Sequence, residues 1–312
     1  MKKYCIGFDI GGTKCAVSLG EICDGNIRVL HREETPTQND PIATLEKLSA
    51  FVRAWKTEYA VSTAGISCGG PLDSKKGVIV CPPNLADGWY GFAIVQYVKD
   101  TFGLDSRLQN DANACAVAEW KFGAGKGTQN MIFLTFGTGL GAGLILDGKL
   151  YAGTNDNAGE AGHIRLMKNG PIGYGKKGAF EGFCSGGGIT RLALEMAARC
   201  KKTPACIEAM GGEVTTKKLS IAAKAGDPFA KKVFAKSGEM LGKGLSILID
   251  VLNPEKIVLG GVFMRSSELL VPAMNKVLRE EALLESLSVC EIVPAKLSEN
   301  IGDIAALAIG DM

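Results

Sequence analysis

The sequence lacks any long hydrophobic run and any excess of charge. No apolar stretch in its 312 residues approaches the roughly 20 residues that a membrane-spanning helix needs. Lysine and arginine number 35 against 33 aspartate and glutamate, so no nucleic acid or anionic membrane is expected as a partner, and small-molecule chemistry is favoured. The start, MKKYCIGFDIGGTK, passes directly into a strand pattern, so we expect no signal peptide or anchor and a cytoplasmic location.

The cysteines also lack any pattern of a metal or redox site. All ten stand singly and no CxxC pair occurs, so the usual spacing of zinc and redox sites is missing. Most lie in apolar neighbourhoods such as GVIVCPP and NACAVAE. We interpret them as small buried hydrophobic residues in a reducing compartment.

What is present is an alternation of strand and helix patterns. Residues 4–10 have strand composition, break at Gly11 and Gly12, and resume as CAVSLGE. STAGISC and GVIVCPPN are further strand candidates, and NDANACAVAEWKFG is a helix candidate for which Asp111 or Asn113 is the expected cap. In the helix pattern ATLEKLSAFVRAWKTEYA, one apolar face is expected to pack on the sheet through Leu45, Leu48, Phe51, Val52 and Trp55.

The same arrangement returns later in the chain. MIFLTF has strand composition, GTGLGAG is a glycine turn, and LILDGKLYAG gives two strand pieces joined at Asp147 and Gly148. Three helix patterns follow (188–200, 219–226 and 227–252), and then the strand KIVLGGV. These patterns predict an α/β fold in two domains, residues 1–117 and 118–312, with the terminal helix pattern of residues 301–312 able to fold back onto the first domain.

Two glycine turns suit a polyphosphate. DIGGTK at residues 9–14 places an acid, two glycines, a hydroxyl and a lysine on a tight turn, where backbone N–H groups approach phosphate closely. Asp9 is a candidate for holding Mg²⁺ through water. An ordinary hairpin turn explains this motif alone equally well. TFGTGLGAG at residues 135–143 is a second such turn, and together they suggest two phosphate loops facing each other across a cleft.

Two other nucleotide motifs lack their structural context. Gly137, Gly139 and Ala142 match a relaxed dinucleotide fingerprint, but that fingerprint needs a helix next, and LILDGKLY is strand-like. GAGKGT near residue 125 resembles a Walker loop, but Gly127 stands where serine or threonine should follow the lysine. We therefore expect neither a dehydrogenase nor a Walker-type site.

Later motifs carry groups that suit sugar hydroxyls. NDAN puts Asp111 at a helix start, where the helix dipole favours an ionised carboxylate able to accept a hydroxyl proton. Taken alone, a helix cap explains it better. In GEAGH, Glu160 and His163 are three apart and point the same way on a helical turn, and Glu181 follows in AFEGFCSGG. A purely structural histidine is the alternative for His163.

The order of motifs resembles the ROK family of sugar kinases and repressors, in the hexokinase, actin and Hsp70 fold group. The resemblance runs almost end to end through DIGGTK, GISCGGPLD with PNLADGW, NDANACAVAE, TFGTGLGAG, NAGEAGH, EGFCSGG and NPEKIVLGGV. It implies a two-domain actin-like ATPase (ribonuclease H-like) α/β fold that holds ATP with Mg²⁺ in the cleft between its domains. It also implies phosphoryl transfer to a hexose or amino sugar, by default the 6-hydroxyl of glucose, in a homodimer or homotetramer.

The resemblance also assigns residues to roles. Asp111 matches the family's catalytic base. The residues implied to bind ATP and its phosphates are Asp9, Gly11, Gly12, Thr13, Lys14, Thr135, Gly137, Thr138, Gly139, Gly260 and Gly261. The residues implied to bind the sugar are Asn84, Asn110, Asp111, Glu160, His163 and Glu181.

One segment departs from the family pattern. Where the family usually shows CGCGxxGCxE, this chain reads IGYGKKGAFE, with Ile172, Tyr174 and Ala179 at the three cysteine positions. We therefore expect no structural zinc. A small apolar cluster is expected to hold the loop in its place: Ile172, Tyr174, Phe180 and Phe183.

Two alternatives lie within the same family. One is a sugar-responsive repressor with a preceding DNA-binding domain, which we do not expect because DIGGTK begins at residue 9. The other is a sugar sensor that has lost transfer activity. The intact Asp111 argues against the second.

Overall fold

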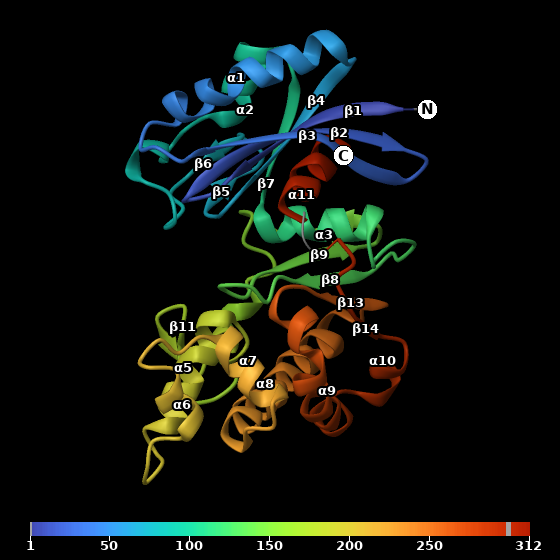
Figure 1. Cartoon of the computed structure of the whole chain (residues 1–312). Helices are drawn as coiled ribbons and strands as arrows, with labels where there is room; N and C mark the ends of the chain where they lie inside the picture. The colour runs from blue at the N-terminus through green and yellow to red at the C-terminus, as the bar shows by residue number, and fades with distance from the viewer. Residues whose placement is uncertain (1, 298–300) are drawn as a thin grey trace. The chain divides into compact units, whose positions relative to one another are not determined.

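A computed structural model of the chain describes residues 2–297 and 301–312, which divide into two compact units (Figure 1). The first unit comprises Met1–Gln129, Gly143–Ala158 and Lys296–Met312, and the second comprises Asn130–Ala142 and Gly159–Ala295. The domain boundary near residue 117 stays a prediction. No helix among the described residues is long and apolar enough to cross a membrane.

The first unit is built on a five-stranded mixed sheet in the order β3-β2-β1-β4-β7. Its strands are β1 (Lys3–Ile10), β2 (Lys14–Cys23), β3 (Asn26–Pro36), β4 (Val61–Cys68) and β7 (Asp105–Asn110). Strands β1 to β3 form an antiparallel meander, whereas β1, β4 and β7 are parallel. Ile10 pairs with Cys68, and Cys68 with Asn110, so the carboxyl ends of the three parallel strands lie at one edge. Ligands of open α/β sheets bind at such an edge.

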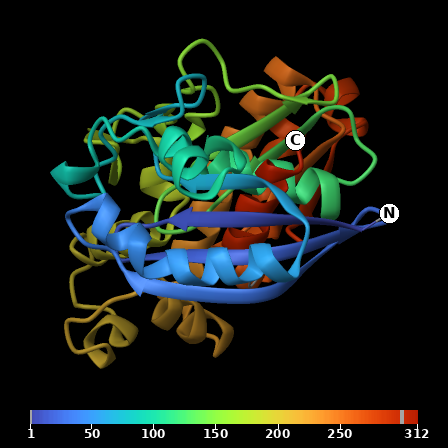
Figure 2. The same cartoon turned by 90° about the horizontal axis from the view of Figure 1, so that it is seen from above.

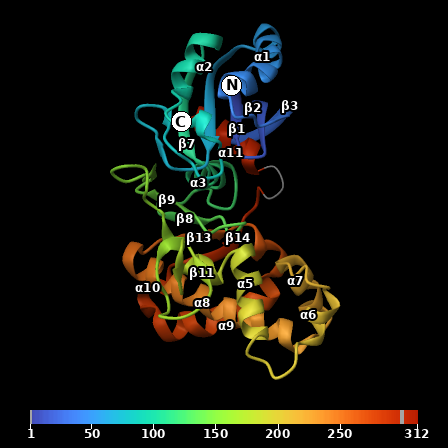
Figure 3. The same cartoon turned by 90° about the vertical axis from the view of Figure 1, so that its left-hand side faces the viewer.

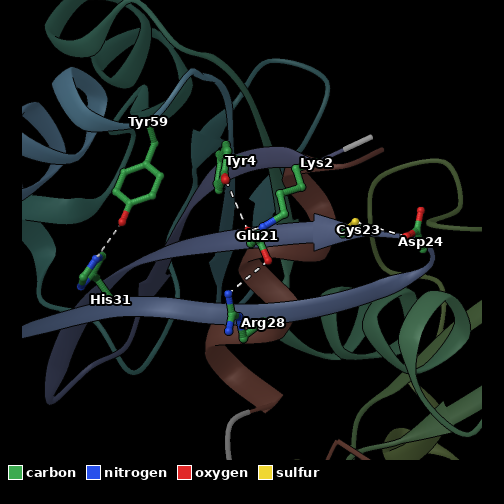
Figure 4. A network of polar contacts seen from close by, with 8 residues as sticks. All are labelled: Lys2, Tyr4, Glu21, Cys23, Asp24, Arg28, His31 and Tyr59. Carbon is green, nitrogen blue, oxygen red and sulfur yellow. Dashed lines mark hydrogen bonds and ion pairs between the residues drawn. The ribbon is translucent and has the colours of Figure 1, made fainter.

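A polar network holds the opposite end of the meander (Figure 4). Glu21 stands opposite Tyr4 on β1 and Arg28 on β3. Its carboxylate accepts hydrogen bonds from both side chains and from Lys2. Because these contacts are cross-strand pairs at the surface, they stabilise the strand register modestly.

Helices cover both faces of this sheet (Figures 2 and 3). The helices α1 (Pro41–Glu58) and α2 (Ile94–Phe102) cover one face, and α11 (Ile301–Gly310) and α3 (Asp111–Phe122) lie on the other. Alternation along β1 explains the two layers. Ile6 and Phe8 join the core under α1, whereas Gly7 faces α11, where a Cβ would lie 3.0 Å from the Leu307 nitrogen.

Two predictions for this unit need correction. The predicted helix over residues 43–60 is confirmed as α1, but Phe51 is 39% exposed, and its ring lies tilted against Trp55 with the centroids 6.2 Å apart. The predicted strand GVIVCPPN shrinks to the two residues of β6 (Val78–Ile79). Pro82 and Pro83 have no N–H to donate, so the ladder cannot continue through them.

Short elements complete the first unit. They are β5 (Leu72–Asp73), the 3₁₀ turn η1 (Asp87–Trp89), and the hairpin of β9 (Ala142–Leu146) and β10 (Lys149–Leu150). Strand β9 approaches α3 closely at Gly143, where a Cβ would lie 2.6 Å from the Ala112 carbonyl oxygen. Only glycine fits there.

The second unit combines three parallel strands with helices. Its strands are β8 (Met131–Leu134), β13 (Lys256–Leu259) and β14 (Glu291–Pro294), with β13 in the middle. Its helices are α4 (Phe180–Phe183), α5 (Gly186–Ala197), α6 (Ala205–Ala209), α7 (Thr216–Lys224), α8 (Pro228–Leu252), α9 (Val262–Glu281) and α10 (Leu284–Ser288). Two further elements are the 3₁₀ turn η2 (Ala161–His163) and the hairpin of β11 (Ile172–Gly173) and β12 (Lys176–Lys177).

The long helices of this unit pack through glycines. Helices α8 and α9 lie side by side, and a Cβ at Gly238 would lie 2.4 Å from the Leu270 carbonyl oxygen. The three predicted helices and the strand KIVL are confirmed as α5, α7, α8 and β13.

Candidate active site

The first glycine turn lies between β1 and β2 and is braced by Thr37. The Gly11 N–H donates to the Lys14 carbonyl oxygen at 3.1 Å, which closes the turn. Thr37 donates its hydroxyl to the Gly11 carbonyl oxygen at 2.6 Å and its amide to the Thr13 carbonyl oxygen at 3.0 Å. Within residues 2–297 and 301–312, the amides of Gly12 and Thr13 donate to no protein group. They are therefore available for phosphate oxygens.

Asn84 lies against this turn. A Cβ at Gly12 would lie 2.0 Å from the Asn84 carbonyl oxygen, so no other residue fits at that position. The Asn84 amide group lies beside Gly69, whose added Cβ would be 3.0 Å from Oδ1. Gly69 directly follows β4, so Asn84 belongs to the same edge as the carboxyl ends of the parallel strands.

Asp9 stands near the end of β1 and is half-buried. The pKa of its carboxyl is raised from 3.8 to about 6, chiefly by burial and then by the charges of Asp303 and Asp111, while Arg32 and Lys14 oppose the shift. The group is therefore ionised near pH 7, but its negative charge destabilises the folded protein. A cation beside Asp9 would stabilise this charge, so the site fits a metal ion that accompanies a phosphate.

The helix that follows β7 begins at Asp111, but another residue caps it. The Asn110 side chain accepts the Asn113 N–H at 2.7 Å. The expectation that Asp111 or Asn113 caps the helix was therefore wrong. Asp111 is exposed, and its Oδ1 accepts the Ala112 N–H at 2.7 Å. Its charge at the helix N-terminus is favoured by the backbone dipoles.

The second glycine loop follows β8 and is held by two other backbone segments. Its Gly137 carbonyl oxygen accepts the Gly186 N–H at 2.7 Å, and its Phe136 carbonyl oxygen accepts the Val262 N–H at 2.7 Å. Gly261 has φ of 58°, and a Cβ there would lie 2.1 Å from the Phe136 oxygen. Strand β9 follows the loop directly, which confirms that no dinucleotide-binding helix begins here.

A cavity of about 860 Å³ opens beside this loop in the second unit. Gly137 and Thr138 form one wall, and the first turn of α5 forms another. Helices α7 and α9 supply hydroxyl, apolar and cationic side chains: Thr216, Lys217, Ser220, Ile221, Lys224 and Arg265. A mixed cavity at the start of a helix suits a nucleotide. The sequence analysis did not predict these cavity-lining residues, although the serine followed by three glycines in CSGGG indicates a helix start that could bind phosphate.

The remaining sugar candidates lie on two segments of the second unit. Glu160 and His163 share the turn η2, since the His163 N–H donates to the Glu160 carbonyl oxygen at 3.1 Å. Both side chains are exposed. Glu181 lies in α4, and its Oε2 accepts the Leu140 N–H of the second glycine loop at 3.0 Å. Glu181 therefore connects α4 to the glycine loop of residues 135–143.

The expected apolar cluster near these residues is half wrong. Phe180 and Phe183 are buried, but Ile172 and Tyr174 are 47% and 45% exposed. These two residues sit in a short hairpin whose tip faces solvent, so they cannot join the core. The Tyr174 ring instead stands edge-on to His163, with centroids 5.4 Å apart. In the described part of the chain, no three His, Cys, Asp or Glu side chains are arranged to hold a metal.

Comparison with known proteins places these features in a family. The family model described as "ROK family" matches residues 5–311. A glucokinase of Streptomyces coelicolor is 32% identical over 276 residues, which cover 87% of this chain and 86% of that protein.

Solved structures agree with this match. A ROK family glucokinase from Streptomyces griseus, in complex with glucose and AMPPNP, is 30% identical with a TM-score of 0.77 and covers 99% of both chains. A ROK family transcriptional regulator, a homolog of the E. coli MLC protein, has 26% identity and a TM-score of 0.85, covering 98% of this chain and 77% of that one. With its actin-like two-sheet α/β architecture, the chain belongs to the ROK family.

Proposed function

We propose that this chain is an ATP-dependent sugar kinase that transfers the γ-phosphoryl group of ATP to the 6-hydroxyl of glucose. Asp111 is the base that accepts the hydroxyl proton. The observation that carries the proposal is the state of Asp111: an exposed carboxylate at the N-terminus of α3, whose capping role is filled by Asn110.

Proton acceptance is the chemistry that this carboxylate supports. It lies at the edge where β1, β4 and β7 end, together with Asp9 and Asn84. Asn110 and Asn84 carry amides that donate to and accept from hydroxyl groups. A sugar held by such groups would present its reacting hydroxyl to Asp111 in a fixed direction.

ATP is proposed to occupy the cavity of the second unit. Its lining of hydroxyl, apolar and cationic groups suits a nucleoside with phosphates. The amides of Gly12 and Thr13 in the first turn, and the second glycine loop from Thr135 to Gly139, are the candidates for phosphate contacts. Asp9 would hold Mg²⁺ through water, and that ion would neutralise charge on the transferred phosphoryl group.

Glu160, His163 and Glu181 are proposed to select the sugar. Glu160 and Glu181 accept hydroxyl hydrogens, and His163 accepts or donates according to its tautomer. Because Glu181 also accepts the Leu140 N–H, sugar binding at this residue would also affect the position of the second glycine loop. The glucokinase relatives support glucose as the first sugar to test.

The test is a coupled assay of ADP formation with purified protein, ATP, Mg²⁺ and separate hexoses and amino sugars, with product phosphate position determined by ³¹P NMR. We expect glucose to be phosphorylated at the 6-hydroxyl. Phosphorylation of another sugar with a higher kcat/KM would replace the glucose assignment. Sugar binding without ADP or sugar phosphate formation would favour the non-catalytic sensor.

A further inference from the structure

The side chain of His163 is held by a residue outside its own motif. Lys176 Nζ lies 2.9 Å from His163 Nδ1. A lysine ammonium carries only donors, so Nδ1 must be the acceptor. A neutral imidazole that accepts at Nδ1 has its hydrogen on Nε2, and His163 is then a donor at that second nitrogen.

The hairpin of β11 and β12 brings Lys176 to this position. Its two turn residues, Tyr174 and Gly175, have φ of 50° and 71°, the left-handed values of a two-residue hairpin turn. Lys176 is therefore the first residue after the turn, opposite Gly173. A Cβ at Gly173 would lie 2.5 Å from the Gly182 nitrogen, so the hairpin packs tightly on α4. The Lys176 backbone has little freedom to move away.

Tyr174 fixes the imidazole from a second direction. Its ring makes an angle of 68° with the His163 ring at a centroid distance of 5.4 Å. A Cβ at Gly162 would lie 3.1 Å from Tyr174 Cε2, so the tyrosine also packs on the turn that carries His163. An edge-on aromatic contact restricts rotation of the imidazole plane.

The other histidine of the chain has a different environment. His31 stacks on Trp55 at 5.8 Å, and its Nε2 lies 3.4 Å from the Tyr59 hydroxyl (Figure 4). It stands on β3, which packs against α1, and the ring contacts described for it are therefore aromatic. With two histidines in 312 residues, the two imidazoles can be observed separately.

We propose that Lys176 is a positioning residue that holds His163 in the tautomer with hydrogen on Nε2, and so makes His163 a hydrogen-bond donor to a sugar hydroxyl oxygen. Its sugar-binding part rests on the proposed function, whereas the tautomer does not. Lys176 thereby determines that His163 donates, rather than accepts, in one hydrogen bond of the sugar site.

The tautomer is measured by two-bond ¹H–¹⁵N correlation of the uniformly ¹⁵N-labelled chain of 312 residues without ligands. The spectrum distinguishes a protonated ring nitrogen from an unprotonated one, and His31→Gln assigns the remaining signals to His163. We expect the Nε2–H form for His163 in the wild type and in Lys176→Arg, which keeps a donor. In Lys176→Met, which keeps the stem, we expect both tautomers. Lys177→Met, at the neighbouring exposed position, is the control and should match the wild type.

Kinetics with the best sugar test the consequence. Loss of one oriented donor should raise the sugar KM about 5- to 10-fold in Lys176→Met, with kcat changed less than twofold. Lys176→Arg should recover most of the affinity, and the KM for ATP should stay unchanged in both variants. A change in kcat alone, or equal losses in Lys176→Met and Lys176→Arg, would contradict a positioning role.

The two hypotheses fail in different ways. An Nδ1–H tautomer of His163 in the wild type, or an Nε2–H form in Lys176→Met that is unchanged from the wild type, overturns the proposal even if the protein is a sugar kinase. The expected tautomers without any sugar phosphorylation overturn the proposed function and leave the role of Lys176 in place. If Lys176→Met does not fold, an Nδ1–H tautomer in the wild type or in Lys176→Arg still overturns the proposal.

Discussion

Asp9→Asn is expected to stabilise the ligand-free protein while impairing catalysis. The pKa of the Asp9 carboxyl is raised from 3.8 to about 6, chiefly by burial. The folded protein therefore binds this proton more tightly than the unfolded chain does. Ionised Asp9 is a stability cost in the folded state, and asparagine has the same shape without the charge.

The cost follows a definite pH dependence. Well below pH 3.8 the carboxyl is protonated in both states and does not change the free energy of unfolding. The destabilisation grows as the pH rises and levels off above about pH 6. A shift of roughly two units corresponds to at most about 3 kcal/mol at pH 7 and about 1.5 kcal/mol at pH 5. Partial solvent exposure of Asp9 lowers both figures.

Urea unfolding at pH 5, 6, 7 and 8 measures this difference. The free energy of unfolding of Asp9→Asn should exceed that of the wild type by more at pH 7 and 8 than at pH 5. Asp105→Asn, at the exposed start of β7, is the control and should show no such trend. No gain at pH 7, or the same gain at pH 5 and pH 8, would refute the reasoning. In activity assays, Asp9→Asn should need more Mg²⁺ for half-maximal rate.

Three further predictions concern the two glycine loops and the zinc content of the protein. Thr37→Val, which removes the hydroxyl bond to the first glycine turn, should raise the KM for ATP about 3- to 10-fold, whereas Thr57→Val on exposed α1 should not. Glu181→Ala should raise the KM for both substrates, because the Leu140 N–H loses its acceptor, whereas Glu181→Gln should affect mainly the sugar; equal effects of the two variants would argue against this link. Elemental analysis should find far less than one zinc per chain, with activity kept after chelation once Mg²⁺ is restored, and zinc-dependent activity would contradict this.

Much of the fold could be predicted because periodicity is local. The strand at β1, the apolar face of α1 and the long helix α8 each carry their signal within a few residues. Strand β7 escaped prediction because DSRLQN has a single large apolar residue, Leu108, and its pairing depends on β4. Tertiary context overrides a weak local preference in such strands.

The candidate site was predictable where a residue acts through its side chain in a recognisable motif. Asp9, Asp111 and Glu160 were proposed in this way, and their roles stay predictions. Thr37 was missed because it acts on the backbone of a turn 26 residues earlier in the chain. Lys176 was missed because its partner His163 meets it only through a hairpin that the sequence pattern did not predict.

The most direct test of the central claim compares wild type with Asp111→Asn for transfer of the γ-phosphoryl group to glucose, followed by ³¹P NMR, with glucose binding measured by calorimetry. The account predicts glucose 6-phosphate from the wild type, and a loss of about 10²-fold or more in kcat for Asp111→Asn with glucose affinity changed only slightly. Turnover by Asp111→Asn close to that of the wild type would contradict the role of Asp111 as the base.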